Sequence, residues 1–362
     1  TDALQAMVLI VGSITISVIG LLKIGGWGNL VSVVEPTHFN MFLPSDHPDF
    51  PWIGMVFAPP IIGVWYWCTD QYIVQRVLSA KNVSEARKGT IFAGYLKLLP
   101  IFMFFIPGLI AYAMTKTGQL SYGSSDQVFP TLVRELLPSG IRGLVAGGLL
   151  AALMSSLSSV FNSCSTLFTM DIYKKLYPET DEKKLVFVGR IATGIVVLSG
   201  ILWIPFIKVV SGAGLYTYLQ SVQAYIAPPI ASVFLLGLFW SRINANGALA
   251  ALVGGFIAGM IRLGLEIKKS TLTVDGIWYQ IADLNFLYFA IFSFLTCVVV
   301  LVAVSMLTPP PDLEKINGLT YDTSKKNIAE TDHPKSDKIN SYIILAILAL
   351  ILIYFSPIGI GG

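Results

Sequence analysis

Long apolar stretches alternate with short polar segments along this chain, and nine of the stretches are long enough to cross a membrane as helices. A helix needs roughly 20 apolar residues to span the hydrocarbon core. The alternating pattern of a barrel strand is absent from the sequence. We therefore predict an all-α integral membrane protein with spans at about 3–23, 51–75, 90–114, 142–171, 186–207, 213–239, 244–265, 285–307 and 341–358.

Composition narrows the class of protein further. Hydrophobic residues make up 54% of the chain and charged residues 12%, with a mean hydropathy of +0.72, which is far from a soluble domain. The three cysteines, Cys68, Cys164 and Cys297, all fall inside apolar stretches, so neither a disulfide framework nor a zinc site is expected. No nucleophile–base pair appears in the spans, so we predict no enzyme. Membrane lipid is an expected partner and nucleic acid is not, while the oligomeric state stays open.

Basic residues indicate the orientation of the chain. If the spans cross alternately, the loops of one face carry fifteen Lys and Arg residues and those of the other carry seven. Because positive loops stay on the cytoplasmic side, residues 24–50 are predicted to be an external loop and 309–340 a solvated cytoplasmic linker. We expect a multi-pass protein of the cell membrane, plasma or inner. The chain opens on Thr1 and not on Met, so we also expect a missing N-terminal portion.

Two spans contain proline pairs. Pro59 and Pro60 precede an aromatic triplet in the second span, and Pro228 and Pro229 lie in the sixth. A proline pair removes two backbone donors and obstructs the preceding turn, so each helix is expected to kink or unwind there. Such a pair can be an ordinary membrane-helix kink. Beside polar residues, however, a broken helix points to the binding site of a transporter.

Polar side chains occur in the same part of the membrane. Tyr216, Gln220 and Gln223 recur at helical spacing and share one face of the sixth span. Lys97 lies too deep in the third span to reach water easily, and is either a functional residue or half of a structural ion pair. Trp65 and Tyr66 lie too far into their span for an interfacial belt. Amides, an ammonium and aromatic faces together suit a sugar or polyol.

A polar stripe marks the fourth span. Ser155, Ser158, Ser159 and Asn162 fall on one helical face, with Ser156 at its edge. One interpretation is that the hydroxyls bond to the carbonyl four residues earlier or to a neighbouring helix. The other is that they hold a small hard cation, and sodium fits better than calcium because no carboxylate cluster accompanies them.

Four segments together resemble the sodium/glucose cotransporter branch of the solute:sodium symporter family. They are WYWCTDQYIVQRVLSAKN at 65–82, GYLK at 94–97, LMSSLSSVFNSCSTLFTMDIY at 153–173, and YLQS followed by PP at 218–229. The resemblance covers nearly the whole chain and weakens after about residue 310. It implies a leucine-transporter-type inverted-repeat fold, present here in part.

The resemblance also implies a division of the chain. Residues 1–265 would be core transport helices five to ten with the first peripheral helix. Residues 266–308 would be a peripheral helix, 309–340 the cytoplasmic linker, and 341–362 a C-terminal membrane helix. The family's first two core helices, which carry the remaining sodium and sugar contacts, would lie upstream of Thr1.

The family's site residues carry over onto matching positions of this sequence. Ser155 and Ser156, with the carbonyl of Ala152, would bind sodium, and Ser158 with Asp2 would form a second, variably used sodium position. The implied substrate contacts are Lys97, Gln220, Tyr66 as the inner gate, Trp65 and Tyr216.

Three departures from the family pattern bear on the substrate. Gly63 replaces a polar residue, Tyr216 stands where Phe is usual, and Gln223 adds an amide where Thr is common. The sequence therefore predicts a sodium-coupled symporter for a hexose-like sugar. An inositol, a sialic acid, an amino acid or a carboxylate remains open on the same scaffold, as does a non-transporting sugar sensor or sodium-channel-like protein.

Overall fold

The computed structural model describes residues 2–210, 214–324 and 335–362, without the side chains of residues 2, 206 and 208–210. In these ranges the chain forms helices and no strand. Nine of its helical segments are long and apolar enough to cross a membrane. The all-α membrane architecture predicted from the apolar pattern is confirmed.

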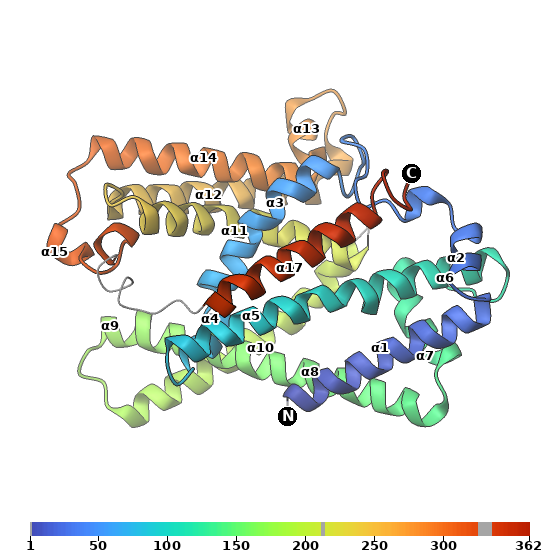
Figure 1. Ribbon diagram of the computed structural model, residues 1–362. Helices are drawn as coiled ribbons and strands as arrows, with labels where there is room; N and C mark the ends of the chain where they lie inside the picture. The colour runs from blue at the N-terminus through green and yellow to red at the C-terminus, as the bar shows by residue number, and fades with distance from the viewer. Residues whose placement is uncertain (1, 211–213, 325–334) are drawn as a thin grey trace. The chain divides into compact units, whose positions relative to one another are not determined.

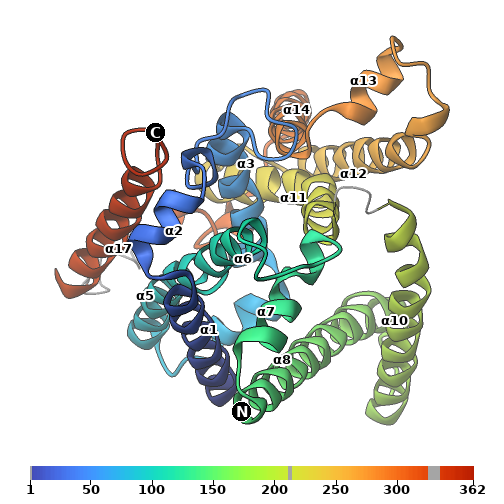
Figure 2. The ribbon, with the colours of Figure 1, turned by 90° about the vertical axis from the view of Figure 1, so that its right-hand side faces the viewer.

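The chain divides into two units, of which unit 1 comprises Thr1–Met41, Lys81–Val209 and Asn340–Gly362. Its helix α1 packs antiparallel on the first half of α8, because Gly12 lies against Val145 and Gly148 against Val8 (Figure 2). Small residues of this kind let membrane helices approach closely. The elements are α1(Asp2–Ile24), α2(Trp27–Val33), η1(Pro36–His38), α5(Val83–Pro100), η3(Ile101–Phe105), α6(Ile106–Lys116), η4(Ser125–Gln127), α7(Val128–Leu136), α8(Ser139–Thr166), η5(Leu167–Tyr173), α9(Lys174–Leu176), α10(Glu182–Val210) and α17(Lys335–Tyr354).

Unit 2 comprises Phe42–Ala80 and Val210–Ile339. Its centre is α11, which packs on α12, α14 and α3. Figure 1 shows α12 and α14 side by side, with α13 at one end of the pair and α15 at the other. The elements are α3(Trp52–Val64), η2(Trp65–Thr69), α4(Gln71–Leu78), α11(Leu215–Phe239), α12(Ala245–Ile267), η6(Lys269–Thr271), α13(Ile277–Asp283), α14(Phe286–Leu307) and α15(Leu313–Ile316).

Some predicted span ends differ from those observed. The second span was expected to reach residue 75 but ends at Thr69, because Asp70 starts a new helix by accepting a hydrogen bond from the Tyr72 amide at 3.0 Å. The third begins at Val83, where the Asn82 side chain caps the Glu85 amide. Both helix boundaries are set by side-chain caps, and a hydropathy pattern contains no information about such hydrogen bonds.

The proline pairs do not unwind their helices. α3 continues through Pro59 and Pro60, and α11 continues through Pro228 and Pro229. The departure from α geometry comes later than expected in the second span, at the π-helical turn η2, where the Trp65 carbonyl accepts from the Asp70 amide and from Thr69 Oγ1. Such a turn often marks a functional position in a helix.

The segment between α1 and α3 is tied to unit 1 by a polar cluster around Glu35. Its carboxylate accepts from Lys116 Nζ at 2.6 Å and from the Tyr112 hydroxyl at 2.8 Å. These hydrogen bonds, that of Lys116 first, lower the pKa of Glu35 to about 2. Nearby, Phe39 is fully buried and its ring lies 6.2 Å from that of Trp27. Residues 24–41 of the predicted external loop are therefore a packed part of unit 1, and residues 42–50 belong to unit 2.

Candidate functional site

In unit 2, the candidate gate residues lie on the π-helical turn η2, which packs against α11. The rings of Trp65 and Tyr66 have centroids 6.2 Å apart, and Trp67 meets Tyr66 edge-on at 5.1 Å. Trp65 and Tyr66 are half-buried, whereas Trp67 is exposed in this unit. Because a π-helical turn shifts the angular position of the residues after it, η2 sets the direction of these rings.

The first turns of α11 have the polar face that their spacing predicts. Gln220 Nε2 donates to the Tyr216 hydroxyl at 3.1 Å, which confirms that the two residues share a face. Gln223 is half-buried one turn further along. A Cβ at Gly63 would meet only Trp67 Cδ1, at 3.9 Å. The missing side chain at Gly63 therefore leaves space in front of the aromatic turn.

In unit 1, the serine stripe lies on α8, an uninterrupted helix from Ser139 to Thr166. Ser155 is half-buried, while Ser156, Ser158 and Asn162 are exposed within the unit. Ser159 donates to the Ser155 carbonyl at 3.0 Å, so the local back-bonding interpretation holds for Ser159. The carbonyl of Ala152 points along the helix axis toward Ser155 and Ser156. The Ala152 carbonyl and the two serine hydroxyls are neutral oxygens, a ligand type that hard cations accept.

Two further predicted residues belong to unit 1. Lys97 lies on α5 with its side chain exposed in the unit. The side chain of Asp2, proposed with Ser158 for a second sodium position, lies outside the described residues. Among the residues that the structure describes, no group of three or more His, Cys, Asp or Glu could hold a metal ion.

The structure thus brings the predicted residues together in two groups. Trp65, Tyr66 and Gly63 adjoin the helix that carries Tyr216, Gln220 and Gln223, all within unit 2. Ala152, Ser155 and Ser156 lie within about one turn of α8, in unit 1. Their roles in binding stay predictions.

A charged cluster on α12 was not predicted from the sequence. Arg262, near the end of α12, is only 3% exposed, and its Nη2 donates to the Leu284 carbonyl at 2.6 Å. One turn later, Glu266 accepts a hydrogen bond from the buried Tyr225 hydroxyl. The sequence does contain one sign of this cluster, because Arg262 is a charged residue inside a predicted span, as Lys97 is, and such residues are rare in membrane helices.

Three comparisons with known proteins bear on this geometry. The model of the sodium:solute symporter family matches residues 1–255. The sodium/myo-inositol cotransporter 2 of Oryctolagus cuniculus is 38% identical over 91% of this chain and 54% of its own length. The sodium/glucose cotransporter 4 of Danio rerio is 35% identical over 92% of this chain and 56% of its own length. This chain therefore spans about half the length of the curated relatives it matches.

A solved structure agrees at the level of the fold. A sodium-coupled sialic acid symporter, in its substrate-bound outward-open state, superimposes with a TM-score of 0.63 and 22% identity. The match covers 85% of this chain and 62% of that one. The symporter fold expected from the sequence is confirmed for the aligned residues.

Proposed function

Because the chain belongs to the sodium:solute symporter family, we propose that it takes part in sodium-driven uptake of a small polyol, either a hexose-like sugar or an inositol. Symporters of this kind are multi-pass membrane transporters and not enzymes. The observation that supports the polyol best is the hydrogen-bonded Tyr216–Gln220 pair on the helix that packs against the aromatic turn η2.

The substrate contacts in this proposal follow from hydrogen-bond chemistry. Gln220 and Gln223 offer both amide donors and carbonyl acceptors, which match hydroxyl groups that donate and accept. Lys97 adds three N–H donors. Trp65 and Tyr66 cover the C–H face of the ring, and Tyr66 is the inner gate. Gly63 leaves space for a substituent where family members have a polar side chain.

Sodium is the coupled substrate in this proposal. The Ser155 and Ser156 hydroxyls and the Ala152 carbonyl supply neutral oxygens, which suit a monovalent cation better than calcium. Ser158 with Asp2 is the proposed second position. If these oxygens bind sodium more tightly in the outward-open state, sodium favours that state and raises substrate affinity, and this differential affinity is the coupling.

The proposed division of the chain follows the same resemblance. Residues 1–265 act as the core transport helices with the first peripheral helix, and 266–308 form a second peripheral helix. Residues 309–340, of which 325–334 lie outside the described residues, form the cytoplasmic linker, and 341–362 form the last membrane helix. Alternating access then requires movement of the core helices around the substrate.

The test is uptake of labelled myo-inositol and glucose into proteoliposomes that contain the full-length protein. We expect accumulation against a gradient only when sodium is higher outside. Gln220→Ala should abolish most of this uptake, whereas Gln75→Ala, on an exposed position of α4, should leave it unchanged.

Other outcomes separate the alternatives. Competition by sialic acid, an amino acid or a carboxylate, with no competition by polyols, would replace the substrate class but keep the symporter. A sodium current on polyol addition without polyol accumulation would indicate a sensor or channel-like protein.

A further inference from the structure

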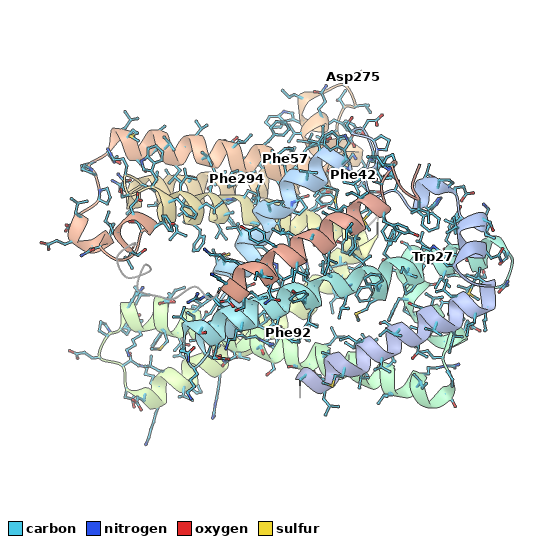
Figure 3. The ribbon with its side chains drawn as sticks, in the orientation of Figure 1. Trp27, Phe42, Phe57, Phe92, Asp275 and Phe294 are labelled. Carbon is cyan, nitrogen blue, oxygen red and sulfur yellow. The ribbon has the colours of Figure 1, made fainter. Side chains whose placement is uncertain are left out.

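A cavity of about 760 Å³ lies in unit 2, at the end of the helices where α13 is found. The loop before α3, the start of α11, the end of α12 and the start of α14 all contribute to its wall. The exposed residues Asp46, Gln280 and Asp283 lie on this wall, so the cavity opens to the surface. Asp275, labelled in Figure 3, lies on the nearby loop but not on the wall.

Arg262 is the unusual residue of this cavity. Its guanidinium lies 5.6 Å from the centre of the Phe289 ring, and its Nη2 bonds to the Leu284 carbonyl. Nε and Nη1 are buried and have no hydrogen-bond partner among the described residues. A buried charged donor without an acceptor is costly. Since Arg262 lines the cavity, a rotation of its guanidinium toward the cavity would let a ligand oxygen supply the missing acceptor.

The remaining wall offers both donors and acceptors. Lys269 Nζ donates to Asp283 Oδ1 at 2.5 Å, and Glu266 lies one turn after Arg262. With Asp46 and Asp49, four carboxylates face two cationic side chains. This excess of carboxylates disfavours an anion, whereas a hydroxyl can accept from the guanidinium and donate to a carboxylate.

Aromatic side chains complete the wall. Tyr279, Phe286 and Tyr288 all line the cavity. Phe286 is buried, while Tyr279 and Tyr288 are half-buried and present partly accessible rings. Aromatic faces beside charged groups of both signs are suited to a ligand with C–H surfaces and many hydroxyls.

We propose that this cavity is a second, external binding site for a small neutral polyol, in which Arg262 donates to the ligand hydroxyls. It is distinct from the candidate substrate residues Lys97, Gln220 and Tyr66, none of which lines it. The positive-inside assignment puts residues 24–50 and 266–284 on the external face. Of the sodium candidates whose side chains are described, Ala152, Ser155, Ser156 and Ser158, none lines the cavity, so we expect the site to bind its polyol without sodium. The inference relies on the proposed function only for the choice of polyol probes.

Protection of an introduced cysteine tests the proposal. Gln280→Cys places a thiol on the cavity wall, and the full-length protein is labelled from outside with a membrane-impermeant thiol reagent. In sodium-free medium, myo-inositol or glucose at ten times its half-protecting concentration should slow labelling about tenfold, because only empty sites react. Asp275→Cys is the matched control and should be labelled at the same rate with and without the polyol.

Two further substitutions identify the donors. Arg262→Lys keeps the charge but loses the planar fork, so the half-protecting concentration should rise about tenfold. Because a buried position can affect folding, Lys269→Gln, at a partly exposed position, provides a second variant and should weaken protection. Lys268→Gln is its neighbouring control, since Lys268 is exposed and does not line the cavity.

The outcomes separate this proposal from the transport proposal. Uptake without protection overturns the external site and leaves the symporter assignment in place. Protection without uptake supports the site and removes the transport proposal. Protection that requires sodium, or that an anionic solute gives and polyols do not, overturns the independent polyol site.

Discussion

Helices α8 and α11 both carry polar residues in the membrane, but they differ in how their units surround them. α11 buries residues along most of its length, among them Tyr218, Ser221, Tyr225 and Ser232. α8 buries only Val145 and Ser163, and leaves Leu153, Met154 and Leu157 exposed within unit 1. Several polar residues of α11 are thus buried in a helix bundle, whereas Ser156, Ser158 and Asn162 of α8 lie on the surface of their unit.

Polar residues at helical spacing therefore occur in two environments, one buried between helices and one exposed on a helix surface. On α11, Tyr225 bonds across to Glu266 on α12, while Ser232 bonds back to the Pro229 carbonyl of its own helix at 2.8 Å. Side-chain bonds between helices stabilise their packing. On α8, Ser159 and Thr166 bond back along their own helix, and Ser165, beyond the serine stripe, bonds to another helix, at the Gly189 carbonyl of α10. We therefore expect substitutions on α8 to change ion binding and those on α11 to change packing as well.

The largest expected effect is on sodium. Ser155→Ala combined with Ser156→Ala removes two proposed ligand oxygens, each worth about 1 to 1.5 kcal/mol. The sodium concentration for half-maximal uptake should rise at least about 30-fold. Flux assays in proteoliposomes measure it, with Ser139→Ala at the start of the same helix as the control. An unchanged sodium dependence in the double variant would falsify the assignment on α8.

The next effect concerns the packing of α11. A Cβ at Gly259 of α12 would lie 2.7 Å from the Tyr225 carbonyl oxygen, and backbone there cannot move easily. We expect Gly259→Val to destabilise the protein by about 1 to 3 kcal/mol, which lowers its melting temperature in detergent.

Two variants test the cause of this loss. Gly254→Val, where a Cβ has open space, should melt like the wild type. Gly148→Val, which meets the Val8 side chain at 2.8 Å, should cost less than Gly259→Val because that side chain can rotate. Equal melting temperatures for Gly254→Val and Gly259→Val would contradict the packing difference.

A smaller effect is expected at Tyr216. Tyr216→Phe keeps the ring beside Phe50 but removes the hydroxyl that holds Gln220. Loss of one hydrogen bond, about 1 kcal/mol, should raise the KM for the polyol about fivefold. Uptake kinetics measure the change, and Tyr342→Phe on an exposed part of α17 serves as the control. If both variants behave like the wild type, the Tyr216–Gln220 pair does not position the substrate.

The smallest expected effect concerns the acid stability of the polar cluster around Glu35, in the segment between α1 and α3. Because the folded pKa of Glu35 is lowered from 4.5 to about 2, its contribution to stability is present above about pH 4.5 and is lost as the pH falls toward 2. Lys116→Met should lower the melting temperature slightly at pH 7 and reduce the acid-induced loss by the same amount, because an exposed ion pair contributes little and its contribution is already lost at low pH. Melting temperatures between pH 2 and 5 measure it, with Lys23→Met as the control. An identical acid profile for Lys116→Met would rule out this linkage.

The expectations from the sequence held where the chemistry is local. Tyr216 and Gln220 were placed on one face by their spacing, and their hydrogen bond confirms it. The predicted unwinding at the proline pairs is not observed, because both pairs stay in α geometry, and the backbone widens only at η2, after Pro59 and Pro60. Proline removes a donor, but the surrounding packing decides where the backbone yields.

The cavity around Arg262 is a feature that could not be predicted from the sequence. Lys97 and Arg262 are both charged residues inside predicted spans, and the sequence alone does not distinguish their surroundings. Only the fold places Arg262 against the Leu284 carbonyl and the Phe289 ring. These contacts join α12 to the start of α14, and hydropathy carries no information about such a pairing.

The sequence by itself determined the existence and helical type of the spans and the polar faces of individual helices, since these follow from helix periodicity and the thickness of a membrane. Its motifs also determined the family. The tertiary structure alone decided that α11 is enclosed while α8 is exposed in its unit, and that a buried arginine faces a cavity. The physical reason is that a helical face is set by local backbone geometry, whereas its environment depends on packing between segments far apart in the chain.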